Sequence, residues 1–181
     1  MEDLFPTVGR WASGYDREEV EEFFERAKAA YENGRISMSS EDVRTAAFDL
    51  VRHGYDPAAV DAALDRLEAA FIQRDRSEFV AAHGQDAWME QVAERATTLY
   101  PRLVRPRGER FAPPERGRGY QREAVDDALD RLVAYFDEGA ELSAAEVRSV
   151  TFPSAPASRA YAEGPVDAFL DRAIDILLAV E

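Results

Sequence analysis

The chain has no cysteine in its 181 residues and only two histidines. The absence of cysteine excludes disulfide bonds, thiol nucleophiles and cysteine-bound metal, and it agrees with a cytoplasmic location. The histidines, His53 and His83, do not have the spacing of a metal-binding pair. Phosphate-binding loops, dinucleotide fingerprints and nucleophile elbows are also missing. We therefore predict a protein that is not an enzyme, with no catalytic residue, metal or cofactor.

Long apolar runs are absent too. No stretch reaches the roughly eighteen apolar residues of a membrane helix, and no basic-then-apolar leader opens the sequence. Positive charge is scarce, since 22 Lys and Arg against 36 Asp and Glu leave a net charge of −14. That balance argues against binding nucleic acid or anionic lipid through the average surface. It suits either a basic partner or simple solubility.

What the sequence does contain is a tyrosine-centred motif in four copies, which we call the corner. In each copy a valine follows five residues after the tyrosine, and a helical apolar pattern begins there. Tyr55 and Val60 occupy the two positions of a hydrophobic staple, with Asp56 as helix N-cap. Gly54 is expected to take a positive φ that ends the preceding element. The corner residues are Gly14, Tyr15 and Asp16; Gly54, Tyr55 and Asp56; Gly119 and Tyr120; and Tyr161.

Capping signals place the other expected helices. Glu19 completes a predicted capping box with Asp16 on a helix that stops at Asn33-Gly34. A second box, Ser39 with Asp42, opens a helix with Val43 and Leu50 on its inner face, which ends at His53. A connecting helix over residues 77–101 is expected, with an interruption at His83-Gly84. The plan then repeats, with Ser143 and Glu146 as the matching box. Trp11 and Trp88 are interpreted as core anchors.

The predicted fold is all-α, with about seven helices in an internally duplicated repeat of four corner-containing units. Strands are not expected, because no alternating stretch of useful length occurs. The predicted organisation is a first half over 1–76, a connecting helix over 77–101, an Arg/Pro-rich linker over 102–118 and a second half over 119–181.

Two sets of charged residues are candidate sites. Each helix after a corner carries two carboxylates four residues apart and then an arginine, as in Glu21, Glu25 and Arg26. Such a pair is able to hold a metal or act as acid and base, but four copies indicate a structural ion-pair element. The linker is the sharper binding candidate, because its arginines either meet an acidic ligand or pair with the chain's own acidic helices. They are Arg102, Arg105, Arg107, Arg110, Arg116 and Arg118.

The corner and the residues around it resemble the N-terminal motif of the DivIVA family. The matching residues are Asp42-Val43-Arg44, Phe48, Gly54-Tyr55-Asp56, Val60-Asp61 and Leu64-Asp65-Arg66-Leu67. The resemblance implies a cytoplasmic scaffold, peripheral at a pole or septum, linked to cell division or polar growth. It implies a protein partner, such as a DivIVA-type coiled coil or an envelope-associated protein.

The family's membrane-docking Phe-Arg pair is incomplete here. Arg118 and Arg159 match its arginine, whereas Ala12, Arg52, Gly117 and Ser158 stand where its phenylalanine belongs. This weighs against membrane docking. The leading interpretation is a non-enzymatic protein-binding adaptor. The alternative is an acidic inhibitor or mimic that binds a basic partner, such as a nucleic-acid-binding protein.

Overall fold

The computed structural model describes residues 3–33 and 37–181, apart from the side chain of Asn33. The chain forms two compact units, residues 1–78 and residues 79–181, which we call unit 1 and unit 2. The boundary falls inside helix α3 (Pro57–His83).

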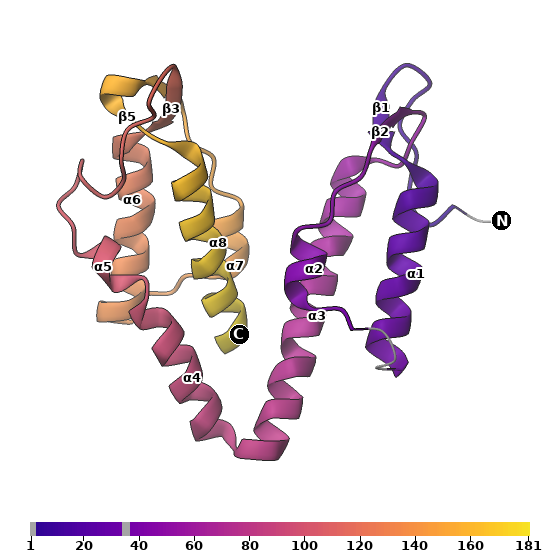
Figure 1. Ribbon diagram of the computed structural model, residues 1–181, viewed down its shortest axis with the longest axis horizontal. Helices are drawn as coiled ribbons and strands as arrows, with labels where there is room; N and C mark the ends of the chain where they lie inside the picture. Colours follow the sequence, from indigo (N-terminus) through magenta and orange to yellow (C-terminus); the bar gives the residue numbers. More distant parts are fainter. Residues whose placement is uncertain (1–2, 34–36) are drawn as a thin grey trace. The chain divides into compact units, whose positions relative to one another are not determined.

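Unit 1 is built on two helices that start at the same small sheet (Figure 1). The chain runs through β1 (Ser13–Tyr15), α1 (Arg17–Asn33), α2 (Ser40–Arg44) and β2 (Leu50–Arg52) into α3. β1 and β2 pair antiparallel with Gly14 opposite Val51, and Tyr15 also bridges Tyr55. The sheet therefore ties together the two corners from which α1 and α3 begin. The predicted stop of the first helix at Asn33-Gly34 agrees with the end of α1, although Gly34 lies outside the described residues.

In unit 2, two additional helices come first in the sequence, and the same plan then repeats (Figure 1). The additions are α4 (Gln85–Thr97) and α5 (Tyr100–Leu103). The repeated part contains β3 (Arg118–Gln121), α6 (Arg122–Val133), the π-helical turn η1 (Ala134–Glu138) and α7 (Ala144–Arg148). It continues with β4 (Ser154–Pro156), the 3₁₀ turn η2 (Ala157–Arg159), β5 (Ala160–Tyr161) and α8 (Glu163–Val180). The sheet order is β4-β3-β5, all antiparallel, with Tyr120 opposite both Ser154 and Tyr161.

The all-α prediction is therefore wrong, because the described residues include two antiparallel sheets with five strands. The expected helix over 39–53 is also wrong: α2 ends at Arg44, and residues 50–52 form β2. Leu50, placed on an inner helix face, is 64% exposed. Strands of two to four residues are too short to show alternation, and their pairing partners lie tens of residues away in the sequence. Local pattern consequently could not reveal them.

The corner glycines serve close backbone approach. Gly14 and Gly54 are not among the positive-φ residues, and the left-handed conformation falls instead on His53, with φ 61°. A Cβ on Gly14 would lie 2.2 Å from the carbonyl oxygen of Tyr55, and one on Gly54 would lie 2.3 Å from that of Tyr15. The predicted positive φ at Gly54 is thus wrong. The glycine is required because two backbones cross where a methyl group does not fit.

The caps follow the sequence signals with one exception. Asp16 accepts from the N–H of Glu18 at 2.9 Å, Asp56 accepts from that of Ala58 at 3.3 Å, and both boxes that begin with serine are present. Hydrogen bonds from the backbone and side chain of each serine lower the pKa of Asp42 and Glu146. The Asp16–Glu19 box is only half formed: the backbone N–H of Glu19 donates to the Asp16 carboxylate at 3.3 Å, but the backbone N–H of Asp16 donates to the carbonyl oxygen of Asp49. The carboxylate of Glu19 instead accepts from the backbone N–H of Asp49 at 2.8 Å, which fastens the loop before β2.

The core of each unit lies between the helices that leave its corners. Tyr55 and Val60 are fully buried in one cluster with Val20, which confirms the predicted staple. In unit 2, Tyr161 and Val166 are equally buried. Trp88 is a core anchor, as expected, and its indole N–H donates to the carbonyl oxygen of Ala179 at 3.0 Å. Trp11 is not, because it sits in the turn before β1 and is 86% exposed.

Candidate functional site

The repeated carboxylates hold the corner tyrosines. The first acid of each repeated pattern interacts with the tyrosine of the opposite corner in the same unit, and in two of the four pairs the phenol donates a hydrogen bond to it. Burial, followed by contact with that acid, raises the pKa of each phenol. The pairs are Tyr55 with Glu21, Tyr15 with Asp61, Tyr161 with Asp126, and Tyr120 with Asp167. These acids therefore connect the two corners of each unit.

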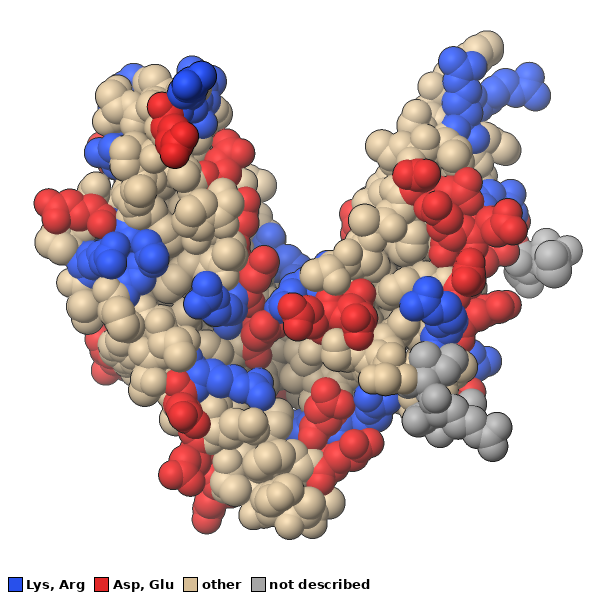
Figure 2. All heavy atoms as spheres, viewed as in Figure 1, with Lys and Arg blue, Asp and Glu red and all other residues tan. Residues whose placement is uncertain are grey.

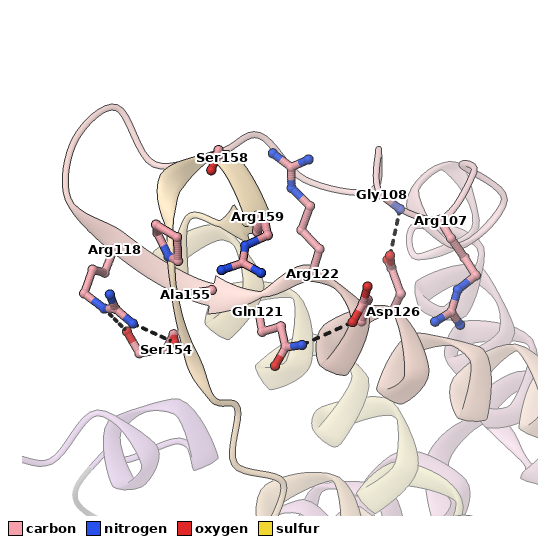
Figure 3. Close-up of a pocket in the computed structure, with 12 residues that line it drawn as sticks. Arg107, Gly108, Arg118, Gln121, Arg122, Asp126, Ser154, Ala155, Ser158 and Arg159 are labelled. Carbon is pink, nitrogen blue, oxygen red and sulfur yellow. Dashed lines mark hydrogen bonds between the residues drawn. The ribbon is translucent and has the colours of Figure 1, made fainter.

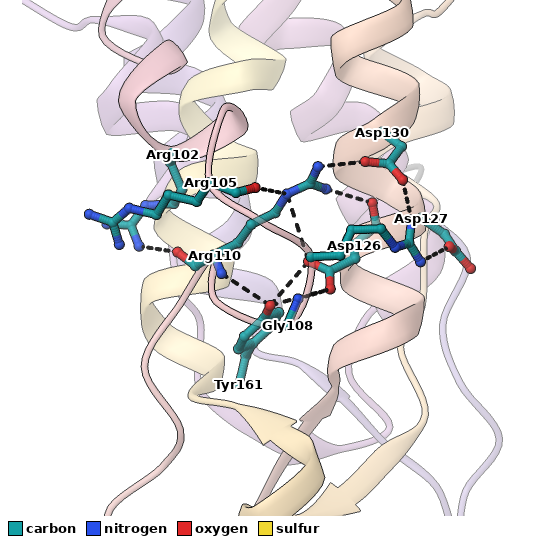
Figure 4. Close-up of polar contacts among 9 residues, drawn as sticks. Arg102, Arg105, Gly108, Arg110, Asp126, Asp127, Asp130 and Tyr161 are labelled. Carbon is teal, nitrogen blue, oxygen red and sulfur yellow. Dashed lines mark hydrogen bonds and ion pairs between the residues drawn. The ribbon is translucent and has the colours of Figure 1, made fainter.

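The arginine-rich segment lies within unit 2, and Arg110 is its deepest member. Arg110 is 5% exposed and inserts against α6, where it donates to Asp130 at 2.5 Å and to the backbone carbonyl of Asp126 at 2.8 Å (Figure 4). Its own backbone N–H donates to the hydroxyl of Tyr161 at 3.1 Å. Arg107 binds Asp127 at 2.6 Å and also Asp130. Of the two alternatives for this segment, internal pairing with α6 accounts for both of these arginines.

The remaining predicted arginines have different surroundings. Arg102 donates to the carbonyl of Arg110 at 2.7 Å and lies 4.5 Å above the ring of Phe111, and its burial lowers its pKa. Arg118 donates to the hydroxyl and carbonyl oxygens of Ser154, both at 2.9 Å. Arg105 and Arg116 are exposed. The six arginines therefore do not form one common patch.

A pocket of about 770 Å³ lies beside β3 and is lined with arginines. Figure 3 shows Arg118, Arg159 and Arg122 spread along β3 and the turn after β4, with Arg107 beyond Asp126. The guanidinium of Arg107 is paired with Asp127 and Asp130, so the guanidinium groups of Arg118, Arg122 and Arg159 and two carboxylates, Glu123 and Asp126, are the other charged groups of the lining. Asp126 is 2% exposed and already accepts from Tyr161 and from the N–H of Gly108.

Two of these pocket arginines were not among the predicted site residues. Arg122 is the first residue of α6; its Nε donates to the carbonyl of Ala160 at 3.1 Å, and its guanidinium carbon lies 5.6 Å from the ring centre of Tyr161. Arg159 is an exposed residue of η2. Arg122 lies four residues after Arg118 in the sequence, whereas only the pairing of β3 with β4 and β5 brings Arg159 near them, so linear spacing carries no signal for Arg159.

Within residues 3–33 and 37–181, no group of three His, Asp or Glu side chains is arranged to hold a metal ion. Across the same described ranges, no helix has both the length and the apolar character needed to cross a bilayer.

No family model matches the chain, and no curated protein or solved structure matches it. The DivIVA resemblance therefore stays a prediction from sequence. Nothing in the described structure supports the scaffold and cell-division roles that it implies.

Proposed function

We propose that this protein is a non-enzymatic adaptor that binds other proteins, and that the arginine-lined pocket of unit 2 takes an acidic segment of a partner. The observation that carries the proposal is the collection of Arg118, Arg122 and Arg159 around one pocket in a chain whose net charge is −14. These arginines are concentrated on one small surface of a chain that is acidic overall.

Guanidinium groups suit carboxylates. The planar guanidinium presents paired N–H donors that match a carboxylate, and a ligand that meets several of them gains both energy and orientation. Arg118 and Arg122 are already oriented by Ser154 and Ala160 through some of their donors, so less side-chain freedom is lost on binding. A short acidic peptide needs only this local patch, whereas a nucleic acid would extend over surrounding acidic surface.

The proposal is tested with a fluorescein-labelled hexaglutamate peptide titrated into the full chain. Arg159→Gln is expected to weaken binding about threefold to tenfold, because it removes an exposed guanidinium of the pocket. Arg95→Gln is the matched control: the same charge is removed from an exposed residue of α4, in unit 2 but outside the pocket.

Binding should also weaken steeply as salt rises. Two outcomes would overturn the proposal. One is equal binding by the two variants. The other is tighter binding of a single-stranded oligonucleotide of equal charge, which would point to a nucleic-acid ligand.

A further inference from the structure

One arginine lies over a buried corner tyrosine in each unit. In unit 1 the guanidinium carbon of Arg17 is 5.2 Å from the ring centre of Tyr55. In unit 2 that of Arg122 is 5.6 Å from the ring centre of Tyr161. Each arginine is the first residue of its helix, and the acid that accepts from the same tyrosine follows four residues later. The two positions are therefore equivalent, and we call these residues the corner arginines.

In unit 1 the corner arginine holds a carboxylate. A terminal nitrogen of the Arg17 guanidinium donates to the carboxylate of Asp3, and the two side chains form an ion pair. Asp3 belongs to the segment that crosses Tyr55, because the backbone N–H of the next residue, Leu4, donates to the Tyr55 hydroxyl at 3.1 Å. Unit 1 thus contains an internal example of a carboxylate bound to a guanidinium beside the corner tyrosine.

Unit 2 has Glu109 in the place of Asp3. The backbone N–H of the next residue, Arg110, donates to the Tyr161 hydroxyl at 3.1 Å, which is the contact that the residue after Asp3 makes in unit 1. The backbone N–H of Glu109 donates to the carbonyl oxygen of Pro106 at 3.0 Å and closes a turn. Glu109 is exposed there, and within the part of the chain that the structure describes it forms no ion pair with the corner arginine.

Arg122 lines the pocket of unit 2 with its orientation already fixed. Its Nε donates to the carbonyl oxygen of Ala160 at 3.1 Å, and its guanidinium lies over the Tyr161 ring. A guanidinium has five N–H donors, and the four on its terminal nitrogens have the paired arrangement that matches a carboxylate. Because the side chain is held in place, binding a carboxylate there costs less conformational freedom.

The acids near the two corner arginines differ in their pairing. Figure 2 shows acidic side chains gathered over α1, and Glu25 on this helix is exposed. The corresponding acid on α6 is Asp130, which also lies four residues after the acid that accepts from the tyrosine. Asp130 pairs with both Arg107 and Arg110. Negative charge near Arg122 is therefore partly neutralised, which favours an added carboxylate in unit 2 over one in unit 1.

We propose that Arg122 binds a side-chain carboxylate of the partner on its terminal nitrogens, as Arg17 binds Asp3 in unit 1. The ligand of the pocket is then one carboxylate that the partner places beside Tyr161, with Arg118 and Arg159 attracting the acidic residues around it. This inference rests on the proposed adaptor function and makes Arg122 the residue that determines the specificity of the pocket.

The test extends the hexaglutamate titration to the corner arginines of both units. Arg122→Gln should weaken binding more than about tenfold, because it removes the donors that contact the carboxylate. Arg122→Lys keeps the positive charge but loses the paired donors, so it should still weaken binding about threefold or more. Arg17→Gln is the matched control, because it removes the same side chain from the equivalent position of unit 1, and its binding should equal that of the wild type.

Two results would overturn the inference: equal binding by Arg122→Gln and Arg17→Gln, or equal binding by Arg122→Lys and the wild type. If urea unfolding shows that Arg122→Gln does not fold, the Arg122→Lys result decides. Failure of the wild type to bind hexaglutamate would refute the proposed function, and this inference with it. Weaker binding by Arg159→Gln together with unchanged binding by the Arg122 variants would refute this inference alone and leave the adaptor proposal standing.

Discussion

Replacing Gly119 by alanine tests whether the crossing of two backbones at the corner is what requires glycine. A Cβ at this position would lie 2.1 Å from the carbonyl oxygen of Tyr161 and 3.1 Å from its carbonyl carbon. Atoms in such contact normally stay at least 3.0 Å apart, so β3 and β5 would have to separate by about 1 Å. The obstacle is backbone, which cannot rotate away as a long side chain can.

The expected loss of stability comes from the contacts that this separation of β3 and β5 disrupts. It loosens the pairing of Tyr120 with Tyr161 and shifts the phenol of Tyr161 away from buried Asp126. Overpacking of this kind costs about 1–3 kcal/mol. For a unit of about 100 residues, each kcal/mol lowers the Tm by about 4–8 °C.

Gly164→Ala is the matched control. Gly164 lies exposed in the first turn of α8, and a Cβ added there would meet nothing within 4 Å. Alanine at this position is expected to leave stability unchanged or raise it by about 0.4–1 kcal/mol, because it restricts the unfolded chain. Both variants are made in a Trp11→Phe background, so that the fluorescence of Trp88 reports the urea unfolding of unit 2. Equal midpoints for Gly119→Ala and Gly164→Ala would refute the reasoning.

Three further predictions concern the pH dependence, the tryptophans and a cap. Burial and the nearby Asp126 raise the pKa of Tyr161 above 10.0, so its contribution to stability is full below that pH and is lost as pH rises through the folded value. As the pH rises through the alkaline range, the Tm should therefore fall less for Tyr161→Phe than for the wild type. Iodide should quench the fluorescence of exposed Trp11 and not that of buried Trp88, so Trp11→Phe should abolish most of the quenching. Unchanged quenching in this variant would mean that Trp11 is buried. Ser143→Ala should lower the free energy of urea unfolding by about 1 kcal/mol, because the backbone N–H of Glu146 loses its capping partner. The control is Ser158→Ala, at an exposed position, and an equal loss of stability in the two variants would contradict the cap.

The arginine-rich segment shows where sequence reasoning stopped short. Composition identified six arginines in an irregular stretch, and the idea that they pair with the chain's own acids holds for Arg107 and Arg110. The pocket, however, combines Arg107 and Arg118 with Arg122 and Arg159, which come from a helix start and a turn. Arg122 lies four residues after Arg118, but Arg159 comes near them through strand pairing across tens of residues, and linear spacing contains no record of that.

The sequence by itself determined what short-range chemistry controls: the capped helix starts, the tyrosine–valine staple and the duplication that repeats after about 105 residues. The caps and the staple depend on residues within one or two helical turns, so their signal is local, and the duplication is visible because these local signals recur in the same order. The tertiary structure alone decided what depends on distant partners. Paired strands replaced part of a predicted helix, glycine proved necessary because another backbone crosses it, and Trp11 was left at the surface. It also decided where the arginines of the irregular segment lie, because only packing places Arg110 between the acids of α6.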